Sequence, residues 1–136
     1  MASFSAQFSA AGTAPLEVTH CKYGFKQTID DKGKPSSVVQ GGIVEVTVLS
    51  TCDVDSQKLI SYMLDAFKQA EGKIEFKRGD QDSIMKKIEF SGAYLVEYSE
   101  VFDARGREDE PAMLTTMKIS ADVFTVDGAS LKNHWK

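Results

Sequence analysis

The chain has 136 residues, of which 42% are hydrophobic and 26% are charged, as is usual for one soluble globular domain. Its 16 Lys and Arg residues and 20 Asp and Glu residues leave a net charge of −4. Nucleic-acid binding needs a basic surface that neutralises phosphates, so this balance argues against a nucleic-acid partner. We therefore expect a single domain over residues 1–136, with a core of its own.

The sequence indicates neither a secretory leader nor a membrane-spanning segment. Residues 1–4 lack the basic and apolar regions of a signal peptide. No stretch approaches the roughly 20 apolar residues that cross a bilayer. We expect synthesis and folding in the cytoplasm, without membrane insertion. If the protein leaves the cell, a machine other than the general export route must carry it.

Alternating apolar and polar residues predict two strands at the start of the chain, at 3–8 and 16–28. A turn that contains Gly and Pro joins them. In the second strand the apolar positions change from even to odd numbers. Such a change predicts a bulge or a corner, and Gly24 is its expected place.

A long polar loop follows, over about residues 30–42, before alternation resumes at 43–49. Loops this long between strands are usually functional or disordered. We interpret this one as an arm that docks on a neighbouring copy of the same protein. The residues expected to make the contact are Asp30, Asp31, Lys32, Gly33, Lys34, Pro35, Ser36, Ser37, Val38, Val39 and Gln40.

The apolar spacing then changes to three and four residues, which predicts one amphipathic α-helix over about residues 53–70. Gly72 stands where a helix usually ends, just past the last turn. The apolar residues that recur at this spacing are Leu59, Ile60, Met63, Leu64 and Phe67.

Further strands are expected at 73–78, 84–90, 93–102 and 113–123. Residues 94–96 are apolar on both faces, so either the helix or another subunit must cover the outer one. The residues of the last strand expected to face inward are Met113, Met117, Ile119, Ala121 and Val123. The loop before this strand carries the acidic residues Asp103, Glu108, Asp109 and Glu110.

Six to eight strands, many joined by tight turns, and one helix predict a mainly β (α+β) fold. We expect an antiparallel β-barrel or two-sheet sandwich with one α-helix on its side. The apolar inward positions are large enough to fill a small barrel.

Candidate catalytic and metal sites are weak. Cys52 lies near the expected start of the helix, but a cysteine nucleophile needs a histidine base. His20 adjoins Cys21, and neighbouring strand residues point to opposite faces, while His134 lies in the tail. No Cys-x-x-Cys or His-x-x-x-His pattern occurs, and residues 30–33 lack the alternating carboxylates of a calcium loop. We expect no enzyme, no cofactor and no metal site.

Eight segments resemble, in their order and spacing, the Bacteroidota branch of the Hcp/TssD proteins, the inner-tube subunit of type VI secretion systems. They are Ser-Phe-Ser-Ala (3–6), Cys-Lys-Tyr-Gly-Phe-Lys-Gln-Thr (21–28), Asp-Lys-Gly-Lys-Pro-Ser-Ser (31–37), Val-Gln-Gly-Gly (39–42), Gly-Lys-Ile-Glu-Phe-Lys (72–77), Met-Lys-Lys-Ile-Glu-Phe (85–90), Ala-Tyr-Leu-Val-Glu-Tyr-Ser-Glu (93–100) and Ile-Ser-Ala (119–121).

The resemblance implies hexameric rings that stack into a hollow tube inside a contractile sheath. It further implies that the tube is fired with a VgrG-type spike into a neighbouring cell and carries effector proteins in its lumen. Residues 30–40 would then contact the next subunit or ring. We hypothesise that Lys32 and Lys34 and the acidic residues of the 103–110 loop steer ring stacking. Two alternatives remain open, a lipocalin-like barrel that binds a small ligand and a phage-type tail tube protein.

Overall fold

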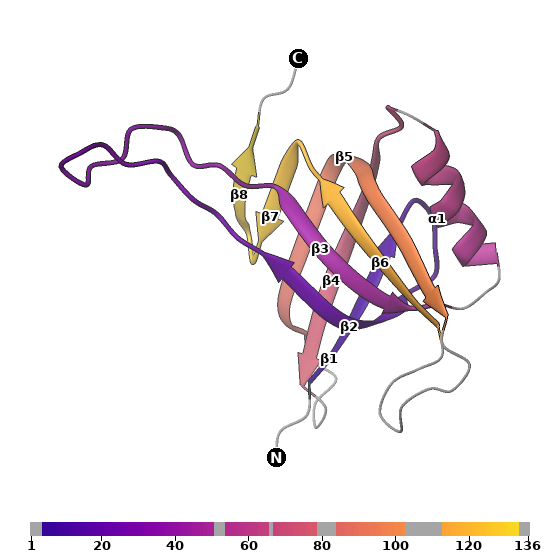
Figure 1. The fold of residues 1–136 in the computed structure, drawn as a ribbon. Coiled ribbons are helices and arrows are strands. Elements are labelled where there is room, and N and C mark those ends of the chain that lie inside the picture. Colours follow the sequence, from indigo (N-terminus) through magenta and orange to yellow (C-terminus); the bar gives the residue numbers. More distant parts are fainter. Residues whose placement is uncertain (1–3, 51–53, 66, 79–83, 103–112, 134–136) are drawn as a thin grey trace.

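The structure is a computed structural model, and it describes residues 4–50, 54–65, 67–78, 84–102 and 113–133. Within these residues the chain forms eight strands and one α-helix (Figure 1). Their bounds are β1 (Phe4–Ala10), β2 (Leu16–Tyr23), β3 (Ile43–Leu49), α1 (Val54–Leu64), β4 (Ala70–Arg78), β5 (Ile84–Phe102), β6 (Met113–Ser120), β7 (Val123–Val126) and β8 (Ala129–Lys132).

Six of the strands close into an antiparallel barrel in the order β1-β2-β3-β6-β5-β4, and β4 pairs back with β1. The 19-residue β5 makes this closure possible, because its first half pairs with β4 and its second half with β6. Gly92, with a φ of 57°, separates the two halves. β7 and β8 extend the sheet from the first half of β5. The predicted fold class is confirmed.

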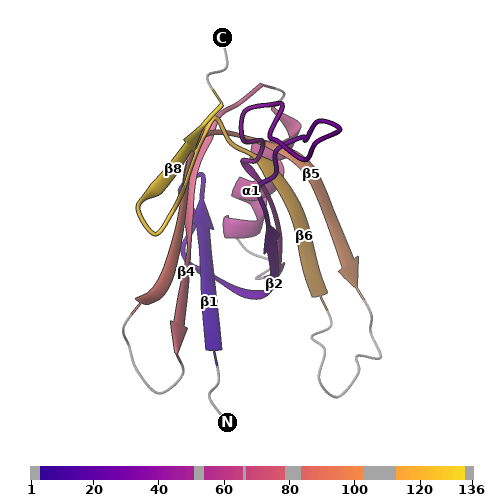
Figure 2. The ribbon, with the colours of Figure 1, turned by 90° about the vertical axis from the view of Figure 1, so that its left-hand side faces the viewer.

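The two features outside the barrel lie on opposite sides of it. Residues 24–42 project far from the barrel between β2 and β3, and α1 packs against the other side (Figure 1). In Figure 2 this projection faces the viewer, and α1 lies behind it. The described part of the chain has no helix that is long and apolar enough to cross a bilayer.

Strict alternation builds the barrel interior, as expected for strands with one buried face. In β3, Val44, Val46 and Val48 are almost fully buried, and in β6 Met117 and Ile119 are. Full burial of such a side chain contributes about 1.5–3 kcal/mol. The other large, fully buried side chains are Phe8, Tyr62, Ile74, Ile88 and Phe124.

The parity change in β2 is real, but its predicted position is wrong. The pairing of β2 with β3 shifts by one residue between Val18 and His20, so Thr19 is the extra residue. The Thr19 hydroxyl donates to the Thr47 carbonyl across the irregularity (3.3 Å), and a bulge of this kind re-aims the following side chains. Gly24 lies beyond the strand, at the base of the projection.

The helix is shorter than the predicted 53–70, because it ends at Leu64. Gly72, expected to end the helix, lies inside β4 and pairs with Ala10 and Phe90. A Cβ at Gly72 would lie 2.6 Å from the Ser9 carbonyl oxygen and 2.7 Å from the Phe90 ring. The glycine is therefore required by close packing of three strands rather than by a helix end.

The end of the chain also differs from the prediction. β6 ends at Ser120, and after a two-residue turn Phe124, rather than Val123, fills the core. No strand was predicted at the position of β8. This strand forms because Asp127 and Gly128, with φ of 50° and 90°, make the two-residue turn that favours a hairpin. Trp135 lies outside the described residues.

Candidate inter-subunit arm

The strand predicted over residues 16–28 ends at Tyr23, so the projection begins earlier than the predicted loop at about 30–42. We name residues 24–42 the arm. It is an ordered ribbon, because its two sides are tied together at two bridges, between Lys26 and Gln40 and between Ile29 and Pro35. The Lys26 amide donates to the Gln40 carbonyl (2.9 Å), and the Gln40 amide donates back (2.6 Å). Between the bridges, the Ser36 amide donates to the Thr28 carbonyl (2.7 Å). The polar loop predicted from the sequence is thus a narrow two-stranded projection.

Asp30 organises the tip of the arm. Its carboxylate oxygen Oδ1 accepts hydrogen bonds from the backbone amides of Lys32 (2.9 Å) and Lys34 (3.0 Å). Its carbonyl accepts from the Gly33 amide (3.0 Å), and Gly33 has a φ of 82°, which favours glycine. Asp side chains commonly hold turns in this way. Asp30 is therefore a structural residue of the tip.

The base of the arm is braced by β7 and β8. The rings of Tyr23, Phe25 and Phe124 pack together with centroids 5.7–6.2 Å apart. The Asn133 side-chain amide donates to the Ala121 carbonyl (2.8 Å) and to the Gly41 carbonyl (3.3 Å). These contacts fix the direction in which the arm leaves the barrel.

The arm exposes apolar side chains as well as charges. Val38 is 82% exposed and Ile29 is 66% exposed, whereas Val39 is 39% exposed. A projection with its backbone hydrogen bonds formed and its aliphatic side chains in water is typical of a segment that a partner covers.

The hypothesis that opposite charges steer ring stacking involves two loops, and the structure describes only the one that carries Lys32 and Lys34. Lys32 and Lys34 are exposed, and among the described residues neither forms an ion pair. The acidic residues Asp103, Glu108, Asp109 and Glu110 lie outside the described residues. The hypothesis therefore stays a prediction.

The groups considered for catalysis are not brought together among the described residues. Cys21 is half-buried, and burial raises its pKa to about 11, which keeps the thiol protonated and unreactive at neutral pH. His20 is exposed. Cys52 and His134 lie outside the described residues. The described segments hold no cluster of three or more His, Cys, Asp or Glu side chains that is suited to a metal ion.

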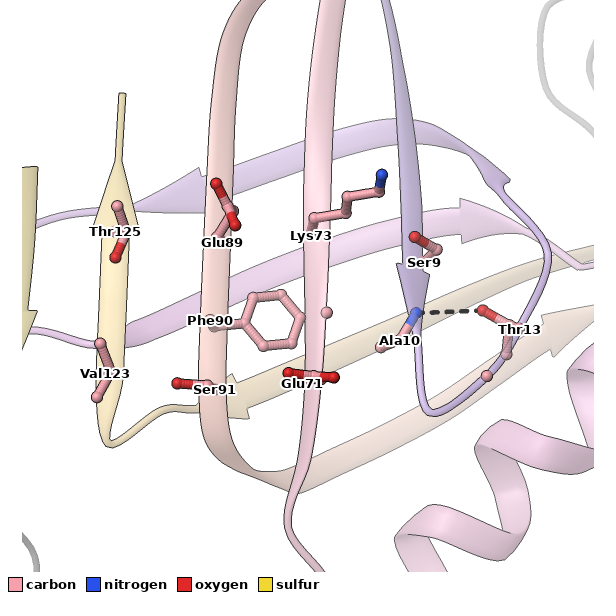
Figure 3. Close-up of a pocket in the computed structure, with 12 residues that line it drawn as sticks. Ser9, Ala10, Thr13, Glu71, Lys73, Glu89, Phe90, Ser91, Val123 and Thr125 are labelled. Carbon is pink, nitrogen blue, oxygen red and sulfur yellow. Dashed lines mark hydrogen bonds between the residues drawn. The ribbon is translucent and has the colours of Figure 1, made fainter. Parts of the chain in front are cut away.

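A groove of about 460 Å³ runs over the outer face of the sheet formed by β1, β4, β5 and β7 (Figure 3). Polar side chains line it, among them Ser9, Lys73 and Glu89, and Lys73 is neutralised by Glu75 (3.3 Å). It is a surface groove, whereas a lipocalin-like ligand site would lie inside the barrel. The barrel interior is filled by the buried side chains described above.

The comparison with known families decides the identity. A family model described as "Hemolysin coregulated protein Hcp (TssD)" matches residues 2–136. The chain belongs to this family. The resemblance predicted from the sequence is therefore confirmed.

Solved Hcp structures share the fold of this chain. Hcp1 from Flavobacterium johnsoniae is 28% identical with a TM-score of 0.83, and the match covers 95% of this chain and 99% of that one. Hcp1 from Salmonella typhimurium is 15% identical with a TM-score of 0.70, over 96% of this chain and 92% of that one. The secreted protein Hcp3 from Pseudomonas aeruginosa is 12% identical with a TM-score of 0.60, over 98% and 99%. No curated protein matches the chain.

Proposed function

We propose that this TssD protein is a subunit of the inner tube of a type VI secretion system. Copies assemble into hexameric rings, and the rings stack into a hollow tube. The tube lies inside a contractile sheath, is propelled together with a VgrG-type spike, and carries effector proteins in its lumen. Assembly takes place in the bacterial cytoplasm, and the same machine then delivers the protein to the exterior or into a target cell.

The observation that carries this proposal is the arm. It is a preformed ribbon that extends well beyond the barrel, and Val38 and Ile29 on it face solvent in the isolated chain. We infer that residues 30–40 contact a neighbouring subunit or ring. In a ring whose copies are not related by a two-fold axis, one copy's arm meets a different surface on the next copy, so the contact is heterologous, and such contacts close into rings or continue as filaments.

A structural role also agrees with the chemistry of the described residues. The tube needs no reaction of its own, since the sheath supplies the force. The Cys21 thiol is held protonated by burial, as expected of a side chain that fills space. The arm therefore remains the feature of the fold that calls for a partner.

The test is the mass of the purified protein by light scattering, with negative-stain images of the same sample. We expect six-fold rings with an open centre. The variant Val38→Ser, which removes exposed apolar area from the arm, should shift the protein towards monomer, whereas Val38→Ile, which keeps the apolar area, should still assemble. A protein that stays monomeric at high concentration would contradict the proposal.

A further inference from the structure

A second concavity lies between the end of α1 and the middle of β5. α1 lies on the side of the barrel opposite the arm (Figure 1). The volume of the concavity is about 410 Å³, within the range of pockets that hold organic ligands. Apolar and aromatic side chains make up most of its lining, with Asp65 and Lys68 adding one charge of each sign. The apolar and aromatic ones are Tyr62, Met63, Phe67, Tyr94, Leu95 and Val96.

The barrel holds this groove in shape without a partner. Tyr62 is buried, and its hydroxyl donates to the Ala93 carbonyl of β5. Leu59, one turn earlier in α1, is also buried in the core. After the helix, the Gln69 side-chain amide donates to the Gly92 carbonyl (3.3 Å). Both walls are therefore fixed relative to each other.

Two local irregularities turn apolar side chains of this groove towards solvent. Phe67 has a φ of 69°, a strained conformation for a bulky residue, and it is 88% exposed. Val96 is the extra residue of a bulge, because the pairing of β5 with β6 shifts between Leu95 and Glu97. Strained backbone conformations cluster at functional sites. Here its effect is an apolar surface, which Leu64, 78% exposed, enlarges.

The arm carries exposed apolar side chains that could fill such a groove. Among the described residues, the most exposed large apolar side chains fall in three places. They are Ile29 and Val38 on the arm, Leu64 and Phe67 beside the groove, and Val101 and Phe102 at the end of β5. The groove offers a concave, mostly apolar surface, so it can surround an inserted aliphatic side chain.

We propose that the groove between α1 and β5 receives the arm of the next copy, with Val38 and Ile29 packed against Phe67, Leu64 and Val96. This inference rests on the proposed function, in which the arm contacts another copy. The arm and α1, which forms one wall of the groove, lie on opposite sides of one barrel (Figure 1), so each copy offers an arm to one neighbour and a groove to the other. Repetition of one such contact builds a closed ring when the rotation between copies is right.

The test is cross-linking between copies. Val38→Cys and Val96→Cys are introduced together into a chain whose native cysteines are replaced by alanine, and a short bis-maleimide is added after the mass is measured by light scattering. Two matched chains pair Val38→Cys with Glu89→Cys, in the groove of Figure 3, or with Val101→Cys. We expect a ladder of cross-linked multimers on a denaturing gel from the 38/96 chain alone.

A second measurement tests the same contact without cysteines. Phe67→Ser should weaken assembly at least tenfold. It should leave the melting temperature of the barrel unchanged, because the Phe67 side chain is exposed. Phe67→Leu should assemble normally.

The possible results separate the two proposals. If multimers form but the 38/89 or 38/101 chain cross-links, or the 38/96 chain does not, the groove is not the docking site of the arm. The proposal that the arm contacts another copy would remain. Normal assembly of Phe67→Ser would also overturn the groove. A 38/96 chain and a wild-type chain that are both monomeric at every concentration would overturn the arm's role and the groove together.

Discussion

Replacing Asp30 by alanine should separate the shape of the arm from its charge. The Asp30 carboxylate holds the tip by accepting hydrogen bonds from the Lys32 and Lys34 amides, at 2.9 and 3.0 Å. Asp31 is the matched control, because it is exposed and, within the described residues, forms no hydrogen bond or ion pair. Asp30→Ala and Asp31→Ala remove the same charge, but only the first removes the turn.

The expected size follows from the two lost bonds. A hydrogen bond contributes about 0.5–1.5 kcal/mol net, and solvent at the tip keeps these two near the lower half of that range. The ordered conformation of the arm then loses about 1–2 kcal/mol of free energy relative to disordered ones. This free energy is subtracted from the free energy of docking. Since 1.4 kcal/mol is a factor of ten, assembly should weaken by about 5- to 30-fold. The melting temperature should not change, because the arm lies outside the core.

The assay is sedimentation or light scattering over a range of concentrations, together with hydrogen exchange of the amides of Lys32 and Lys34. In Asp30→Ala these amides should exchange faster and assembly should need a higher concentration. In Asp31→Ala both should stay close to wild type. Equal weakening by the two variants would refute the reasoning, because it would mean that charge, and not the preformed tip, governs docking.

Three further predictions concern packing, reactivity and charge. Gly72→Ala should destabilise the barrel by about 1–3 kcal/mol in urea unfolding, whereas Gly24→Ala, whose Cβ would meet nothing within 4 Å, should be nearly neutral; equal effects would contradict the three-strand contact. In a variant that lacks Cys52, Cys21 should react slowly with maleimide at pH 7.5 and faster as the pH approaches 11. Rapid labelling at neutral pH would show that the thiol is not held protonated. Changing Lys32 and Lys34 to Glu should weaken ring stacking more than ring formation, by at most about 1 kcal/mol for each pair, and stacks that persist unchanged at low salt would exclude charge steering.

The barrel could be predicted from the sequence because each of its strands buries one face. The valines of β3 alternate with polar residues, and so do Met117 and Ile119 of β6, so a period of two residues is enough to assign the strands and their inward sides. The arm could be located because the polar run between β2 and β3 has no such period. Its hydrogen bonds could not be predicted, although Asp30 and Gly33 are the residue types that hold turns.

The end of α1 could not be predicted, because it is decided by pairing between distant segments. Ala70 pairs with Ala93, and Gly72 pairs with Ala10 and Phe90, so the chain must leave the helix before it enters β4. Helical spacing within residues 53–70 contains no information about these contacts. β8 was missed for another reason, since its Asp-Gly turn is a local signal but the four residues after it are too few to show alternation.

The wrong assignments at the end of the helix bear on the candidate site. By spacing, Leu64 and Phe67 belong to the apolar face of the helix predicted over residues 53–70. In the isolated chain both are exposed, beside a groove that the rest of α1 and β5 hold rigid. The hydrophobic effect that shaped this pattern does not distinguish burial within one copy from burial between copies. Apolar residues that the pattern assigns to a core and the fold leaves in water are therefore where a second copy is expected to bind.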